Sequence, residues 1–288
     1  MISARTRVCA VIGDPVEHSL SPQLHNAAFR ASAVDLVYVA FRVRPNDLAA
    51  AIAGVRALGL RGLSVTIPHK VAILPLLDKV DPSATHIGSV NTVVNRGGEL
   101  AGYSTDGPGA LRALRAAGVA AEGKKILLLG SGGAARAVAF ALAALTPQPE
   151  LVVLGIEADE VERLVGDLRE RTGVQVSGKR LEPDILREAV TGSDILIHAT
   201  PVGMAPRIRE SVVPVELLQP GQVVFDLVYV PFETELLRAA KAAGAIAVPG
   251  LGMFVHQAAI QFELWTGQPA PLQVMEDTVK EILTGVQE

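Results

Sequence analysis

The sequence predicts a two-domain α/β protein, because strands and helices alternate along it in two successive series. The first series occupies the N-terminal part, where apolar or alternating runs are separated by amphipathic segments. The second begins at Lys125 with an almost fully apolar strand, KILLLG, followed by a glycine-rich turn and an alanine-rich helix. Continuous apolar strands are typical of a sheet buried on both faces. A chain of 288 residues has room for two such domains, each with a mainly parallel sheet.

The individual elements follow from hydrophobic periodicity and from turn residues. Pro68 is expected to end a strand, since it cannot donate to a sheet ladder. The run Thr105-Asp106-Gly107-Pro108 is expected to be a loop that opens a helix and separates the two series. The expected strands are 8–12, 37–43, 63–67, 90–94, 125–129, 151–154, 194–198 and 223–227, and the expected helices of the first series are 22–32, 47–58 and 71–77.

Composition excludes several classes of protein. With 49% hydrophobic and 19% charged residues, the chain has material for a packed core and is not disordered. A net charge of −4 argues against nucleic acid as an obligatory partner. The single cysteine, Cys9, lies in an apolar run and is most simply a core residue. The apolar runs are too short for a signal peptide or a membrane span, so we expect a soluble, cytoplasmic protein without a membrane partner.

A lysine follows the third expected strand, in the segment Ser64-Val65-Thr66-Ile67-Pro68-His69-Lys70. The region beyond the carboxyl end of a strand is where α/β domains present catalytic groups. Lys70 is therefore a candidate catalytic residue, and a solvated lysine at the start of the next helix is the alternative.

The glycine-rich turn after residues 125–129 has the spacing G-x-G-x-x-A directly between a strand and a helix. Glycines allow the tight turn and close backbone approach, while the helix N-terminus faces a pyrophosphate. This context predicts a dinucleotide site rather than a simple turn. Its candidate cofactor-binding residues are Gly130, Ser131, Gly132, Gly133, Ala134 and Ala135.

The end of the next strand indicates which dinucleotide binds. Gly155-Ile156-Glu157 is followed by Ala158, Asp159 and Glu160, with no lysine or arginine to neutralise a 2′-phosphate. An acidic side chain here can accept hydrogen bonds from ribose hydroxyls, as in NAD sites. Glu157 is our candidate for that role, and favourable charge at a helix start is the alternative for Asp159 and Glu160.

Further polar residues fall at expected strand ends or helix starts, and each also has a structural interpretation. Ser21 before Pro22 is a ready N-cap, whereas Ser19 is less easily explained in that way. Asn91 lies in an apolar strand and needs partners if buried. Asp106 could cap the following helix, and Gln257 could be filler in an apolar helix.

Taken together, these segments resemble the shikimate dehydrogenase family. The resemblance is carried, in family order and over nearly the whole length, by SLSP (19–22), SVTIPHK (64–70), GSVNTVV (88–94), GYSTDG (102–107), GSGGAAR (130–136), HATPVGM (198–204), DLVYVPFET (226–234) and GLGMFVHQA (250–258). It implies a substrate-binding catalytic domain at 1–105, a Rossmann NAD(P)-binding domain at 106–249, and C-terminal helices at 250–288 that return to the first domain.

The resemblance also implies reversible hydride transfer between NADPH and 3-dehydroshikimate, giving shikimate in the chorismate and aromatic amino-acid pathway. Lys70 and Asp106 would be the catalytic pair, and no metal is expected. The implied substrate-binding residues are Ser19, Ser21, Thr66, Asn91, Tyr229 and Gln257. The motifs add Thr200, Leu227 and Gly250 to the cofactor-binding residues.

The sequence departs from the family pattern at several positions. Ser64, Ser104 and His198 stand where asparagine is common, and a structural role is the simplest interpretation of His198. Gly155-Ile156-Glu157 replaces the usual Asn-Arg-Thr of NADP-using members. We therefore predict NAD preference or relaxed specificity, although NADP is the family default. Arg136 or Arg163 could still reach a 2′-phosphate from elsewhere.

Three alternatives stay open at this point. An NAD-dependent quinate/shikimate dehydrogenase of quinate catabolism is the nearest, and an aminoshikimate-type enzyme is more distant. A non-catalytic dinucleotide-binding protein on the same fold is the third. The oligomeric state is open, with a homodimer as one option.

Overall fold

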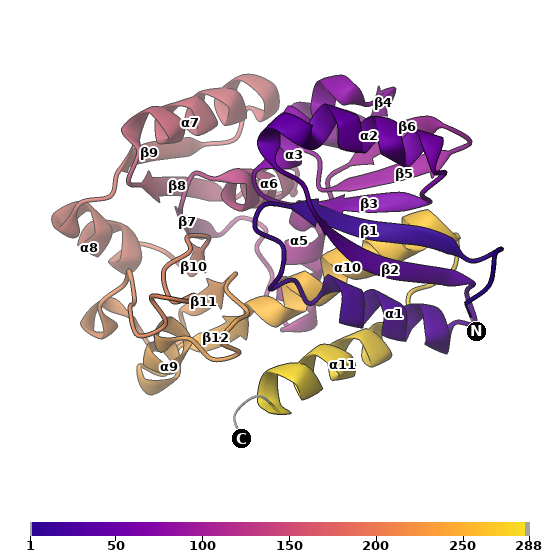
Figure 1. Cartoon of the computed structure of the whole chain (residues 1–288). Coiled ribbons are helices and arrows are strands. Elements are labelled where there is room, and N and C mark those ends of the chain that lie inside the picture. Colours follow the sequence, from indigo (N-terminus) through magenta and orange to yellow (C-terminus); the bar gives the residue numbers. More distant parts are fainter. Residues whose placement is uncertain (1, 286–288) are drawn as a thin grey trace. The chain divides into compact units, whose positions relative to one another are not determined.

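The computed structural model describes residues 2–285, and these form two compact α/β units (Figure 1). The first unit contains the residues up to Thr105 and those from Val255 onward, and the second contains Asp106–Phe254. The change from one unit to the other at the C-terminal side falls inside helix α10 (Gly250–Thr266). The predicted two-domain α/β class with helices at the C-terminus is confirmed.

The first unit is built on a six-stranded sheet in the order β2-β1-β3-β5-β6-β4. β1 is parallel to β2 and β3, while β5 is antiparallel to β3 and forms a hairpin with β6. The strands are β1 (Arg7–Gly13), β2 (Leu36–Arg42), β3 (Gly62–Val65), β4 (Lys79–Val80), β5 (Thr92–Arg96) and β6 (Glu99–Tyr103). The helices are α1 (Ser21–Ala31), α2 (Leu48–Ala57), α3 (His69–Ala72), α4 (Pro82–Ile87) and α11 (Leu272–Gly285), with 3₁₀ turns η1 (Pro45–Asp47) and η2 (Leu74–Leu76).

Two expected elements of this unit are wrong in their extent. The strand expected at 63–67 ends at Val65, three residues before Pro68. The helix expected at 71–77 is instead α3 followed by the 3₁₀ turn η2. Pro75 explains the break, because its ring lacks an amide hydrogen and clashes with the preceding helical turn.

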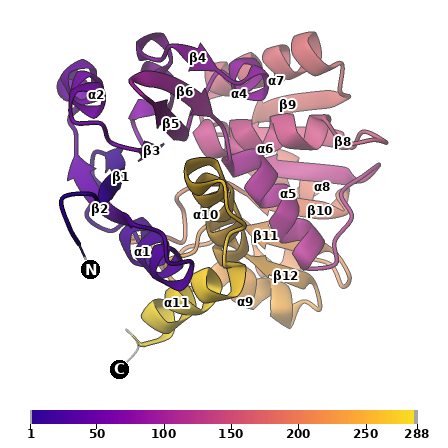
Figure 2. The same cartoon turned by 90° about the vertical axis from the view of Figure 1, so that its right-hand side faces the viewer.

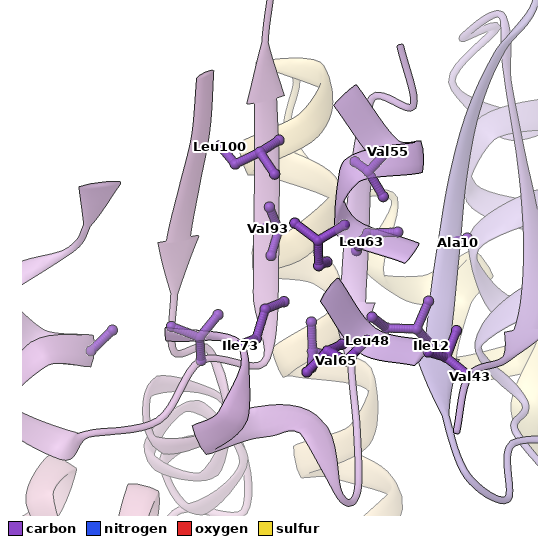
Figure 3. Close-up of a cluster of buried hydrophobic side chains, with 13 residues drawn as sticks. Ala10, Ile12, Val43, Leu48, Val55, Leu63, Val65, Ile73, Val93 and Leu100 are labelled. Carbon is purple, nitrogen blue, oxygen red and sulfur yellow. The ribbon is translucent and has the colours of Figure 1, made fainter. Parts of the chain in front are cut away.

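Both faces of the first sheet are covered. On one face, Leu48 and Val55 of α2 pack against Leu63 and Val93 of the sheet (Figure 3). The other face carries a cluster of contacting rings, some stacked and some tilted, from α1, β2 and α10: His25, Phe29, Tyr38, Phe262 and Trp265. Helix α11 packs along α1 (Figures 1 and 2).

The second unit has a six-stranded, fully parallel sheet in the order β12-β11-β10-β7-β8-β9. The strands are β7 (Lys125–Leu129), β8 (Glu150–Gly155), β9 (Val176–Arg180), β10 (Ile195–His198), β11 (Val223–Asp226) and β12 (Ile246–Pro249). The helices are α5 (Asp106–Ala116), α6 (Gly133–Ala143), α7 (Ala158–Thr172), α8 (Pro183–Thr191) and α9 (Glu235–Ala242), with the turn η3 (Val215–Leu217). This is the doubly wound Rossmann order, in which the order of the strands reverses between β7 and β10.

Sequence patterns account for these elements. Ile126–Leu129 are at most 1% exposed, as expected for a strand covered on both faces. Helix α7 buries Val161, Leu164, Val165 and Leu168, a stripe with helical spacing. The helix ends at Gly173, whose φ of +68° suits glycine. Within residues 2–285, no helix combines the length and apolarity that crossing a bilayer requires.

Candidate functional site

Lys70 is the second residue of α3, just past the carboxyl end of β3. Backbone hydrogen bonds tie this segment to the neighbouring strands. Thr66 N donates to Ile12 O (3.0 Å), Val65 N to Asn91 O (2.8 Å), and Val90 N to Lys70 O (2.8 Å). The first unit therefore brings Thr66, Lys70 and Asn91 to one sheet edge, and Lys70 itself is half-buried.

The Asn91 side chain is 3% exposed, and Thr105 forms hydrogen bonds with both polar atoms of its amide. The Asn91 Oδ1 atom accepts from Thr105 N (2.8 Å), and Asn91 Nδ2 donates to Thr105 Oγ1 (2.9 Å). Thr105 Oγ1 is in turn 3.5 Å from Gln257 Oε1. Two predicted substrate-binding residues are thus joined through Thr105, which sequence reasoning did not select.

Gln261 continues this polar network into the core. It is 2% exposed, and its Nε2 atom donates to Thr92 Oγ1 (3.0 Å). Its Oε1 atom accepts from Ser64 Oγ (2.7 Å), which accepts from Tyr38 OH (2.6 Å). Gln261 was missed, although its position one helical turn after Gln257, in an otherwise apolar helix, was a usable signal.

Neither Ser19 nor Ser21 caps the N-terminus of α1. Helix α1 begins at Ser21, so the N-cap residue is Leu20 and no side chain caps the helix. The capping interpretation of Ser21 is therefore wrong. Ser21 is buried and lies close enough to the Tyr38 hydroxyl to lower its pKa slightly against the larger effect of burial, while Ser19 Oγ accepts from Ser21 N (3.3 Å). The two serines thus adjoin the same network through Tyr38.

Asp106 is the first residue of the second unit and of helix α5, and it is 7% exposed. It follows Thr105 directly, and Thr105 is held by the Asn91 amide. Gly107 allows α5 to approach α6, since a Cβ there would lie 2.5 Å from Ala137 O. Covalent linkage thus places the Asp106 backbone next to a residue anchored on the first sheet.

The glycine-rich loop between β7 and α6 has the shape that a dinucleotide needs. Gly130 has φ of +115°, and a Cβ there would lie 2.7 Å from Ala199 O. Gly132 is the N-cap of α6, and a Cβ there would have nothing within 4 Å. The loop therefore leaves open space beside Gly132 at a helix N-terminus, which fits a pyrophosphate.

Three other predicted cofactor-binding residues belong to strand ends of the same sheet. Leu227 N donates to His198 O (2.9 Å), and a Cβ on Gly250 would lie 2.5 Å from Leu227 O. Thr200 contacts the glycine-rich loop, with its Cγ2 atom 3.4 Å from the position of a Cβ on Gly130. The second unit therefore brings Gly130, Thr200, Leu227 and Gly250 to the carboxyl edge of the sheet.

The carboxyl end of β8 is acidic. The two candidate 2′-phosphate ligands, Arg136 and Arg163, already interact with other groups of the protein. Ser131 Oγ donates to Glu160 Oε2 (3.0 Å), so a carboxylate lies beside the glycine-rich loop. Arg136 pairs with Asp167 (2.5 Å) and lies over the ring of Phe140. Arg163 Nε donates to the carbonyl oxygen of Asp159 (3.2 Å).

Tyr229 lies in the second unit, stacked on Phe254 with ring centroids 4.5 Å apart. Burial raises the pKa of Tyr229, so its hydroxyl stays protonated at neutral pH and can donate.

Among residues 2–285, no three His, Cys, Asp or Glu side chains gather in a way that could hold a metal ion.

The first unit presents a half-buried lysine and buried amides at one sheet edge. The second unit presents a glycine-rich loop on a Rossmann sheet. These features are those of a nicotinamide-dependent oxidoreductase. Comparison with known proteins specifies it further. Residues 11–93 match the model of the shikimate dehydrogenase substrate binding domain, and residues 250–280 match that of the shikimate 5′-dehydrogenase C-terminal domain. The chain belongs to the shikimate dehydrogenase family and is an NAD(P)-dependent oxidoreductase that acts on a CH–OH group.

The similarity extends over almost the full length of the relatives. A protein of Moorella thermoacetica named shikimate dehydrogenase (NADP⁺) is 46% identical over 98% of this chain and 95% of its own. A shikimate dehydrogenase structure in complex with NADP⁺ has a TM-score of 0.91 and 42% identity, covering 98% of each chain. A shikimate 5-dehydrogenase structure from Listeria monocytogenes, in complex with shikimate and NAD, has a TM-score of 0.89 and 38% identity, also covering 98% of each chain.

Proposed function

We propose that this protein catalyses the reversible reduction of 3-dehydroshikimate to shikimate, in the cytoplasmic pathway to chorismate and aromatic amino acids. The observation that carries the proposal is the gathering of Lys70, Asn91 and Thr66 at one sheet edge by backbone hydrogen bonds. The names of the relatives support the substrate.

The polar residues of the first unit fit a polyhydroxylated carboxylic acid. Ser19, Ser21, Thr66, Asn91 and Gln257 offer hydroxyl and amide groups that can donate to a carboxylate or exchange hydrogen bonds with ring hydroxyls. The hydrogen bonds between Asn91 and Thr105 hold the Asn91 amide in one orientation, which would orient it for binding substrate. Tyr229 would supply a further hydroxyl from the second unit.

Lys70 and Asp106 are the proposed catalytic pair. Reduction of a ketone places negative charge on its oxygen, and the Lys70 ammonium would stabilise that charge and deliver a proton. The Asp106 carboxylate would orient the ammonium and accept from the same hydroxyl. A bound nicotinamide dinucleotide supplies or takes up the hydride.

We further propose that NAD is accepted at least as well as NADP. Support comes from the acidic end of β8, where Glu157 would accept from ribose hydroxyls and Glu160 hydrogen-bonds Ser131. Arg136 is held by Asp167 and Phe140, which disfavours its use as a 2′-phosphate ligand. Carboxylates facing a 2′-phosphate would repel it.

Initial rates of oxidation of shikimate and quinate, each with NAD⁺ and with NADP⁺, test these proposals. We expect shikimate to have the highest kcat/KM and NAD⁺ to match or exceed NADP⁺. Quinate turnover above that of shikimate would move the assignment to quinate catabolism. No turnover of either acid would leave an altered substrate or a non-catalytic dinucleotide-binding protein.

A further inference from the structure

His198 and Asp226 form a buried pair at the carboxyl edge of the second sheet. They end the neighbouring strands β10 and β11 and lie opposite each other in register. His198 is 1% exposed and Asp226 is 0% exposed. On its other side His198 is in register with Leu129, the residue before Gly130 of the glycine-rich loop. The pair therefore lies next to the point where the strand order reverses, at which a Rossmann sheet binds its ligand.

The hydrogen bonds of Asp226 assign the proton on the histidine ring. Asp226 Oδ1 is 2.8 Å from His198 Nδ1 and accepts from Val228 N (3.0 Å), while Oδ2 accepts from Thr234 Oγ1 (2.6 Å). An ionised carboxylate can only accept, so His198 Nδ1 carries a hydrogen. If the imidazole is neutral, the other nitrogen, Nε2, is then an acceptor.

The position of the proton on His198 decides how the Thr200 hydroxyl forms hydrogen bonds. Its Oγ1 atom lies 2.5 Å from His198 Nε2, and to a neutral ring the hydroxyl donates its only proton. The same oxygen accepts from Val202 N at 3.3 Å. A hydroxyl oxygen has two lone pairs, so one remains for a ligand. Thr200 can thus offer a ligand an acceptor and no donor.

The location of Thr200 indicates which ligand meets this acceptor. Thr200 is half-buried, and its Cγ2 atom lies beside Gly130 of the glycine-rich loop, 3.4 Å from where a Cβ on that residue would be. We propose that His198 and Asp226 are positioning residues that fix Thr200 Oγ1 as an acceptor for a donor group of the dinucleotide, a ribose hydroxyl or the carboxamide. This inference rests on the proposed dinucleotide site and gives the Thr200 hydroxyl a defined polarity there.

A double-mutant cycle on dinucleotide binding tests the proposal. Dissociation constants for NAD⁺ are measured by titration calorimetry without substrate, for wild type, Thr200→Val, His198→Asn and the double variant. Asparagine, which is common at this position in the family, has a shorter side chain than histidine, so this variant tests whether the imidazole ring itself is needed to hold Thr200 Oγ1. We expect each single variant to weaken NAD⁺ binding about three- to tenfold, as for loss of one neutral hydrogen bond. The double variant should bind as Thr200→Val does.

Two controls separate positioning from a general structural role. Thr200→Ser keeps the hydroxyl and should retain wild-type affinity, and Thr191→Val removes an exposed hydroxyl of α8 and should have no effect. A purely structural His198 would lower the melting temperature and weaken binding equally in the Thr200→Val background. Such additivity, or an unchanged affinity of either single variant, would overturn the proposal.

The outcome also distinguishes this inference from the proposed function. If wild type binds neither NAD⁺ nor NADP⁺, the dinucleotide site itself is wrong. If wild type binds and Thr200→Val binds equally well, only the role of His198, Asp226 and Thr200 is wrong. Thr200 is half-buried in a loop, so its variants remain informative even if His198→Asn fails to fold.

Discussion

Gly62 of β3 and Trp265 of α10 share one space in the core of the first unit. A Cβ on residue 62 would lie 2.1 Å from Trp265 Nε1. The indole can approach because glycine has no side chain, and it donates to Val93 O at 3.0 Å. This contact ties the C-terminal part of α10 to the centre of the first sheet.

Gly62→Ala should therefore destabilise the protein by about 3 kcal/mol, because the added methyl displaces the indole and leaves a buried hydrogen bond unmade. Denaturant unfolding followed by the fluorescence of Trp265 measures the change. Gly54→Ala, in helix α2, is the matched control, since a Cβ there meets nothing within 4 Å. It should stabilise by about 0.5–1 kcal/mol. Equal stabilities of the two variants would refute the packing argument.

His25 should make stability depend on pH. Burial lowers its pKa from 6.5 to about 3, and its ring is stacked on Tyr38. The hydrogen bond from its Nε2 atom to Gln261 Oε1 (3.3 Å) favours the charged ring but does not outweigh burial. Between these pKa values the unfolded chain binds a proton that the folded chain does not, so stability falls as pH decreases from about 6.5 toward 3.

The His25 contribution amounts to at most about 1.4 kcal/mol for each pH unit in that window. Urea unfolding at pH 7, 6 and 5 measures the slope, and His25→Gln should reduce it even if that variant is less stable overall. His86→Gln, which removes an exposed imidazole, is the comparison. A slope that His25→Gln leaves unchanged would mean that other groups cause the acid sensitivity.

Lys70→Ala should lower kcat for shikimate oxidation by about 10²–10⁴-fold, the usual worth of a positioned proton donor. Shikimate binding, measured by calorimetry, should change much less. Asp106→Asn should also lower kcat. Lys79→Ala is the matched control, because Lys79 is exposed and paired with Glu99 (2.5 Å). Turnover by Lys70→Ala at the wild-type rate would assign Lys70 another role.

The double change Ile156→Arg and Glu157→Thr should shift preference toward NADP⁺ by about 10- to 100-fold in kcat/KM. It removes a carboxylate and adds a guanidinium, which forms charge-assisted hydrogen bonds to phosphate. Affinity for adenosine 2′,5′-bisphosphate should rise in parallel. Glu162→Gln, which removes a charge one turn further along α7, should have little effect. A double variant with unchanged preference would show that other residues select the cofactor.

Local pattern was sufficient for much of the fold and for the dinucleotide loop. The apolar run Lys125–Leu129 and the glycines after it predict strand, turn and helix, because both signals are short-range. The ends of the elements were predicted less well, since strand β3 ends at Val65, before the proline that was expected to end it. The short strands β4, β6, β9 and β12 were not identified, since little hydrophobic pattern marks them.

Residue pattern alone was enough to predict the two-series α/β organisation, the glycine-rich loop and the candidate residues Lys70, Asn91 and Asp106. The hydrogen-bond partners of the polar groups depend on the folded chain. Thr105 and Gln257, 152 positions apart, meet beside Asn91, and Gln261 reaches Asn91 O across 170 positions. His198, interpreted from sequence as structural, connects Asp226 to Thr200. Which groups pair in this way is set by strand register and helix packing, which depend on the whole chain and not on short-range pattern.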